Sequence, residues 1–80
     1  MKFYYVYILI SESKVHYYTG FTTDIHARLK EHNYGHCPHT AKYKPWIIKN
    51  AFAFRDKDKA INFELYLKSP SGRAFAKKHF

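Results

Sequence analysis

Residues 3–21 read FYYVYILISESKVHYYTGF, and this stretch decides the fold. The run at residues 3–10 consists of β-forming residues that are apolar on both faces, which is typical of a central strand covered on both sides. The polar segment 11–14 indicates a turn, and the β-forming run at residues 15–21 indicates a second strand. The sequence therefore predicts a β-hairpin whose first strand lies inside the sheet.

The register of this hairpin determines how close two tyrosines lie. If Ile10 pairs with Val15 across a four-residue loop, Tyr7 lies directly opposite Tyr18. Opposed residues share one face of a sheet, with Cβ atoms about 5 Å apart. The hairpin thus predicts two neighbouring phenols. The alternative is that both are ordinary core residues whose hydroxyls are tied to partners.

Capping residues and helix breakers divide the rest of the chain. Thr22, Thr23 and Asp24 are candidate N-caps for a helix that runs to about Asn33, and Gly35 is a natural stop for it. The elements expected next are a loop at 35–45, a strand at 46–54, a helix capped by Asp56 or Asp58 and ending at Lys68, a break at 69–72, and a short third helix with Pro70 in its first turn. The order β-β-α-β-α-α predicts an α+β fold, an α/β sandwich, in one domain spanning residues 1–80.

Composition limits the class of protein. An 80-residue domain buries only about 60–65% of its unfolded surface, and eight Tyr and seven Phe suit the dense core that it needs. The single cysteine, Cys37, excludes an internal disulfide and fits a reducing compartment, so we expect a cytoplasmic protein. No apolar run approaches the roughly 20 residues of a membrane span, and the Tyr-rich start does not resemble a signal peptide. We therefore expect no membrane partner.

The charge points toward nucleic acid, with solubility alone as an equal alternative. Fourteen Lys and Arg against six Asp and Glu give a net charge of +8. Tyr43 and Trp46 stand among lysines and could stack on bases, although Trp46 could also be core. The start of the third helix could dock a phosphate, although a plain helix cap is the simpler interpretation. The candidate nucleic-acid-binding residues are Lys42, Lys44, Lys49, Lys68 and Arg73.

Glu64 stands out because it interrupts an apolar stripe of the second helix. Its neighbours one turn away include Ala60, Ile61 and Leu67. A buried carboxylate is costly unless it is paired or binds a metal. Its chemistry suits a hard divalent ion such as Mg²⁺. An ion pair with Lys68 or Arg28 is the alternative, and on pattern alone it is slightly favoured.

Arg28 and His32 lie one turn apart on the first helix and border its apolar stripe. An arginine there can hold a phosphate with two parallel hydrogen bonds, although a solvated helix face is the simpler interpretation for a lone Arg. The nearby segment His36-Cys37-Pro38-His39 resembles metal ligands. No second pair at zinc-finger spacing accompanies it, so we favour a flexible loop.

Several of these features resemble the GIY-YIG nuclease family. Tyr5-Val6-Tyr7 is similar to the GIY element and Tyr18-Thr19-Gly20 to the YIG element, and Arg28 follows Tyr18 by ten residues, as in that family. The segment 64–78, which reads ELYLKSPSGRAFAKK, is similar to small stand-alone members of bacterial origin. The resemblance covers nearly the whole chain, and the order and spacing of its motifs are more specific than any one motif.

The resemblance implies a three-stranded antiparallel sheet flanked by helices, and a nuclease acting on DNA, branched or damaged DNA included. By position it implies that Tyr7 and Tyr18 activate water, that Arg28 binds the phosphate, that His32 lies near the site and that Glu64 holds one Mg²⁺ or Mn²⁺. A role in DNA repair or recombination follows, with a protein partner that supplies specificity. The alternatives are a non-catalytic nucleic-acid-binding module on the same fold and a protein-interaction domain.

Overall fold

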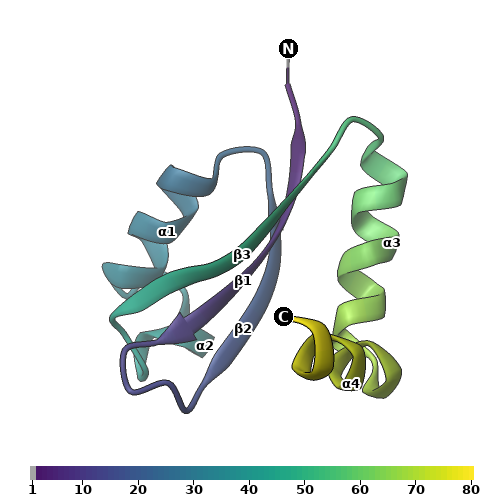
Figure 1. Ribbon diagram of the computed structural model, residues 1–80. Helices are drawn as coiled ribbons and strands as arrows, with labels where there is room; N and C mark the ends of the chain where they lie inside the picture. Colours follow the sequence, from purple (N-terminus) through teal and green to yellow (C-terminus); the bar gives the residue numbers. More distant parts are fainter. Residues whose placement is uncertain (1) are drawn as a thin grey trace.

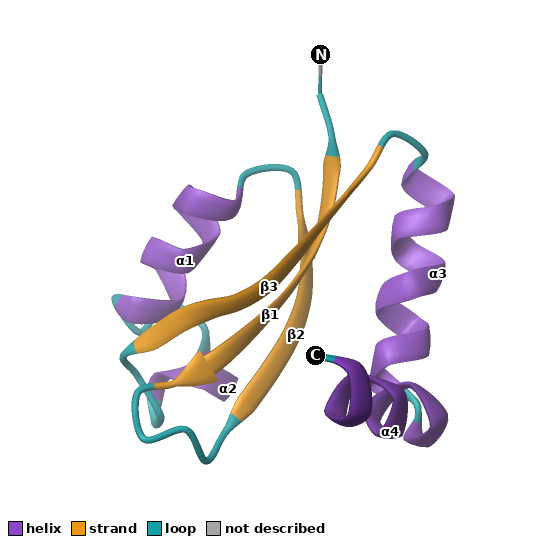
Figure 2. Ribbon diagram, viewed as in Figure 1, coloured by secondary structure: helices purple, strands orange, loops and turns teal. Residues whose placement is uncertain are grey.

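The computed structural model describes residues 2–80 as a β-sheet between two groups of helices (Figure 1). In Figure 1, α1 and α2 lie on one side of the sheet, and α3 and α4 lie on the other. Figure 2 shows the same layers by class of element. Along the chain the elements are β1 (Tyr4–Ser11), β2 (Tyr17–Thr22), α1 (Ile25–Asn33), α2 (Pro38–Ala41), β3 (Trp46–Phe54), α3 (Lys57–Lys68) and α4 (Pro70–His79).

The predicted α+β fold is confirmed, with one addition. The strands lie in the order β2-β1-β3, and β1 is antiparallel to both neighbours. The segment expected to be a loop at 35–45 contains the one-turn helix α2. Because β2 and β3 are parallel to each other on either side of β1, α1 belongs to a crossover connection that carries the chain over one face of the sheet.

The hairpin register differs from the predicted one. Tyr7 pairs with Gly20, not with Tyr18. The strand continues through Ser11, because its backbone N–H donates to the carbonyl of His16 at 2.9 Å and its hydroxyl accepts from the His16 N–H at 3.1 Å. The four-residue loop therefore lies at 12–15. A shift of two residues leaves every side chain on its original face, so Tyr18 is a diagonal neighbour of Tyr7, with ring centroids 6.3 Å apart.

Strand β1 is covered on both faces, as predicted. Val6 and Ile8 pack with α3 in one core, which partly buried aromatic side chains complete. Tyr7 and Leu9 point the other way and form a second core with Trp46 and side chains of α1. Alternation along one central strand thus supplies both cores.

A β-bulge at Lys49 divides the side chains of β3 between these two cores. The pairing of β3 with β1 skips Lys49. Without this extra residue, alternation would put every even-numbered side chain of β3 on one face. Instead Phe52 packs on the α3 side, whereas Ile48 and Trp46 pack on the α1 side.

The long helices begin at the capping residues that the sequence offered. Oδ1 of Asp24 accepts the N–H of Ala27 at 3.1 Å, and Asp56 caps α3 in the same way. Gly35 follows α1 with a φ of 81°, a left-handed conformation that favours glycine. Within residues 2–80, no helix has the length and apolar character needed to cross a membrane.

Candidate active site

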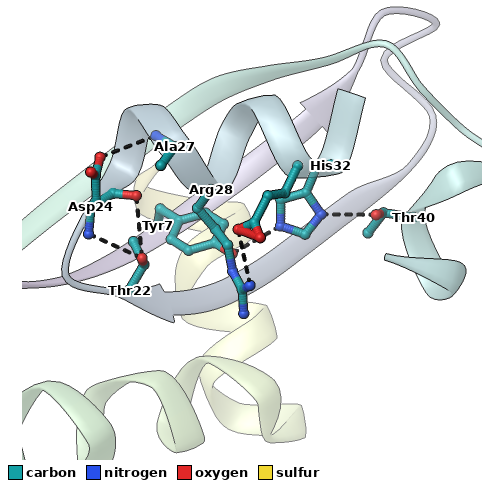
Figure 3. Close-up of polar contacts among 8 residues, drawn as sticks. Tyr7, Thr22, Asp24, Ala27, Arg28, His32 and Thr40 are labelled. Carbon is teal, nitrogen blue, oxygen red and sulfur yellow. Dashed lines mark hydrogen bonds and ion pairs between the residues drawn. The ribbon is translucent and has the colours of Figure 1, made fainter. Parts of the chain in front are cut away.

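The side chains of Tyr7 and His32 meet in the core between β1 and α1. The Tyr7 hydroxyl lies 2.9 Å from Nε2 of His32, and the two residues are 2% and 0% exposed. On its other side, Nδ1 of His32 lies 2.8 Å from Oγ1 of Thr40. Figure 3 shows the resulting row from Tyr7 through His32 to Thr40. The sequence placed Tyr7 and His32 near the site, but it gave no sign of Thr40.

The hydrogen-bond network assigns the proton positions in this row. The Thr40 hydroxyl donates to the carbonyl of Cys37 at 3.2 Å, so it accepts from Nδ1–H of His32. Nε2 of His32 then has a free lone pair and accepts from the Tyr7 hydroxyl. The row can therefore carry a proton away from Tyr7 onto a neutral imidazole.

The pKa values of the pair fit these positions. Burial raises the pKa of Tyr7 to about 12, although hydrogen bonding and charge from Arg28 oppose the rise. Burial, with the positive charge of Arg28, lowers the pKa of His32 below its ordinary value. At pH 7 the phenol is protonated and the imidazole is neutral, so the base in the pair is His32.

Gly20 provides the space in which the Tyr7 hydroxyl lies. A Cβ built at Gly20 would overlap the hydroxyl and the adjoining ring atoms of Tyr7. The backbone φ of Gly20 is not in the left-handed region. Glycine is therefore needed here because a side chain would occupy the space of the Tyr7 hydroxyl, and not because of its backbone conformation. The glycine of the second sequence motif thus allows the phenol of the first to extend across β2.

Tyr18 completes the aromatic surroundings of His32. Its ring centroid lies 4.9 Å from that of His32 and 6.3 Å from that of Tyr7. The side chain is partly exposed, unlike that of Tyr7. Tyr18 therefore lies between the buried pair and the surface, where a substrate would approach.

Arg28 lies beside this cluster (Figure 3). One terminal nitrogen, Nη1, lies 3.3 Å from Oε1 of Glu31. The guanidinium Nε is buried and has no hydrogen-bond partner among residues 2–80. A buried donor without a partner is costly, and a phosphate oxygen is a suitable partner for a guanidinium. Glu31, which the sequence analysis did not single out, holds Arg28 from the side.

Glu64 comes from the other side of the sheet. Tyr7 packs with α1, whereas Glu64 belongs to α3, which packs against Val6 and Ile8. The carboxylate is 17% exposed, and Oε2 lies 3.1 Å from Nζ of Lys68. The ion pair anticipated as an alternative is therefore present. The structure therefore gathers Tyr7, Tyr18, Arg28 and His32 on the α1 side of the sheet, whereas Glu64 lies on the helix that covers the opposite side.

Few side chains of the protein are placed to act as ligands for a metal ion. Within residues 2–80, no group of three His, Cys, Asp or Glu lies close enough together to hold one. Magnesium commonly takes one or two carboxylates and completes its shell with water and phosphate oxygens. Glu64 fits such a site with its second carboxylate oxygen, since only Oε2 is paired with Lys68.

The candidate nucleic-acid-binding residues fall in two places. Lys49, Lys68 and Arg73 line one groove beside α4, whereas Lys42 and Lys44 line a separate hollow next to the hairpin loop. Trp46, considered as a base-stacking residue or as core, is 4% exposed and belongs to the core. Its Nε1–H donates to the carbonyl of Thr40 at 2.8 Å, which fixes α2 against the sheet.

Comparisons with known proteins bear on the family and the fold of the chain. The family model of the GIY-YIG catalytic domain matches residues 3–78. Among solved structures, the chain is similar to the UPF0213 protein BH0048 from Bacillus halodurans, determined by solution NMR. The two are 33% identical, with a TM-score of 0.57, and the match covers 96% of this chain and 81% of that chain. The search of curated proteins gave no match.

Proposed function

The chain belongs to the GIY-YIG family, and we propose that it is a divalent-metal-dependent endonuclease that hydrolyses DNA phosphodiester bonds in repair or recombination. The observation that carries the proposal is the row Tyr7–His32–Thr40 beside Arg28. A proton acceptor and a guanidinium lie next to each other there. Hydrolysis of a phosphodiester needs both, one for the attacking water and one for the charge on the phosphate.

In this proposal, Tyr7 accepts the proton of the attacking water as its own proton passes to Nε2 of His32. The Thr40 hydroxyl holds His32 in the tautomer that can accept that proton. Tyr18, which is partly exposed above the pair, positions the water. Arg28 donates to a non-bridging phosphate oxygen, and this supplies the partner that its buried Nε lacks.

Glu64 is the proposed ligand for one Mg²⁺ or Mn²⁺ ion. When bound, such an ion stabilises the negative charge that develops on the leaving oxygen. For Glu64 to bind it, the carboxylate turns from Lys68, whose ammonium is then available to a phosphate. Specificity beyond the phosphate is proposed to come from a protein partner.

The test is cleavage of a panel of linear, nicked and branched DNA with Mg²⁺ and with Mn²⁺. Replacing Glu64 by Gln keeps the size of the side chain but removes the charge that a divalent ion needs, so cleavage should fall severely while DNA binding persists. Asp58→Asn, at an exposed position in the first turn of α3, is the matched control for the loss of one negative charge. Arg28→Ala should lower turnover by about 10²–10³ with a smaller loss of binding. If Glu64→Gln cleaves as the wild type does, the metal assignment is wrong.

The alternative is a non-catalytic nucleic-acid-binding module. It is favoured by the pairing of Glu64 with Lys68 on the face opposite Tyr7. A wild-type protein that binds the whole panel but cuts no member of it with either ion would support this alternative.

A further inference from the structure

A groove lies on the α4 side of the sheet, outside the cluster around Tyr7. Its volume is about 760 Å³, within the range of about 300–1,000 Å³ that ligand sites occupy. We call it the α4 groove. Among the residues that line it are Tyr17 of β2, Lys49 at the bulge of β3, Lys68 of α3, Arg73 and Lys77 of α4, and Phe80.

The charged side chains that line the α4 groove are all basic. Four of its lining side chains are Lys or Arg, and none is acidic. Lys49 donates to the carbonyl of Phe80, and Lys68 pairs with Glu64. Arg73 and Lys77 form no ion pair within residues 2–80. Two cations are therefore free to neutralise an anion.

The floor of the groove is apolar and aromatic. Ile8, Leu67 and Ala76 form part of it, and Tyr17 presents a ring that is 59% exposed at its rim. A flat, partly apolar group attached to an anion fits both the floor and the cations. Nucleotide bases attached to phosphates have this character, and unpaired bases stack on aromatic side chains.

The groove borders the proposed catalytic cluster at Tyr18. That residue lines the α4 groove and also packs with Tyr7 and His32. It belongs to β2, the edge strand of the sheet. A strand bound at Arg28 reaches the groove by turning around this edge. Duplex DNA is stiff over about 150 base pairs, so turning it around a molecule whose extents are 31 × 30 × 18 Å costs bending energy. A single strand makes the same turn without that cost.

We propose that the α4 groove binds unpaired nucleotides adjoining the phosphate that is cut, which makes DNA with a single-stranded segment the substrate class. The proposal rests on the nuclease function above, because it assigns the path of the substrate beyond Arg28. Tyr17 stacks on a base, and Arg73 and Lys77 contact phosphates of the unpaired strand.

Metal-free binding tests the groove without any need for cleavage. The affinity of the wild type is measured in EDTA by fluorescence anisotropy for three probes of one sequence: a single strand, a blunt duplex and a duplex with a single-stranded arm. The two probes with unpaired nucleotides should bind about 10-fold or more tightly than the blunt duplex. Arg73→Ala with Lys77→Ala should remove that preference and flatten the salt dependence for the single strand by about 1.4 in log–log slope. Lys57→Ala with Lys59→Ala, an equal loss of charge on the exposed first turn of α3, should keep the preference.

A crosslinking experiment gives a second readout that does not depend on affinity. A single strand carrying 5-iodouracil should crosslink on irradiation to peptides that contain Tyr17 or Phe80. The Tyr17→Ala variant should lose the crosslink at Tyr17 and bind the single strand about 5-fold or more weakly. Circular dichroism establishes that each variant is folded.

The outcomes separate this proposal from the nuclease function. Equal affinity for the three probes, or Arg73→Ala with Lys77→Ala indistinguishable from the Lys57/Lys59 control, would overturn the groove assignment even if the protein cuts DNA. A protein that cuts nothing, yet prefers the single strand through Arg73 and Lys77, would retain the groove and lose the catalytic assignment.

Discussion

Replacing His32 by Gln is the perturbation that bears most directly on the proton path. The Gln amide oxygen can still accept a hydrogen bond from the Tyr7 hydroxyl, but it cannot take up the proton at neutral pH. In the variant, Tyr7 must lose its proton to bulk water. With a pKa of about 12, only about one Tyr7 in 10⁵ is ionised at pH 7.

This fraction sets the size of the effect and its dependence on pH. If only ionised Tyr7 can act as the base, the cleavage rate of His32→Gln could fall by up to about 10⁵-fold at pH 7. General bases typically contribute about 10²–10⁴-fold to a rate. We therefore expect cleavage by His32→Gln to be slower by about 10²–10⁴ at pH 7. Its rate should then rise about tenfold per pH unit toward the pKa of Tyr7. The wild-type rate should level off above the lowered pKa of His32.

The assay is single-turnover cleavage of one labelled branched DNA from pH 6 to pH 9. Single-turnover conditions keep product release from hiding the chemical step. Tyr7→Phe is the control, because it should be inactive throughout the range. Circular dichroism at each pH establishes that the variants remain folded. A His32→Gln profile that is as flat as the wild-type profile, at a similar rate, would refute the assigned role of His32.

Three further predictions concern stability. Gly20→Ala puts a methyl group where the Tyr7 hydroxyl lies, so the free energy of unfolding in urea should fall by about 1–3 kcal/mol, and an unchanged value would mean that Tyr7 can move aside. Thr40→Val keeps the shape but leaves Nδ1–H of His32 buried without its acceptor, and urea unfolding should show a loss of about 1–3 kcal/mol; a loss near zero would contradict the assigned tautomer. The pKa of His32 is lower in the folded protein than its ordinary 6.5, so the unfolded chain binds the proton first as the pH falls. The contribution of His32 to the free energy of unfolding is therefore constant above pH 6.5 and decreases below it. The midpoint of thermal unfolding should therefore drop between pH 7 and pH 5 by less in His32→Gln than in the wild type.

Local rules predicted the elements and the shared face of the two motif tyrosines. The capping residue Asp24 and the left-handed Gly35 bound α1 as the sequence indicates. Tyr7 and Tyr18 share a face even though the predicted register was wrong, because side chains alternate with a period of two and the error was two residues. The register itself was set by hydrogen bonds of Ser11, a polar residue that the pattern assigned to the turn.

Features that depend on tertiary packing were not predictable in this way. The apolar neighbours of Glu64 indicated the buried side of its helix, but not which face of the sheet that helix covers. Thr40 reaches His32 only because α2 is held by Trp46, and a one-turn helix in a segment with Gly and Pro has no periodicity to reveal it. The bulge at Lys49 reverses the faces of β3 at a single unpaired residue, and no glycine marks it.

The most direct test of the claim that the Tyr7 hydroxyl activates the attacking water is to remove that one oxygen atom. Wild-type protein and Tyr7→Phe are compared on the same branched DNA with Mg²⁺, by measuring cleavage on a denaturing gel and binding by anisotropy. The account predicts that the wild type cuts the DNA and that Tyr7→Phe binds it with similar affinity without cutting it, because only the hydroxyl that bonds to Nε2 of His32 is lost. Cleavage by Tyr7→Phe at the wild-type rate, or no cleavage by the wild type, would contradict the account.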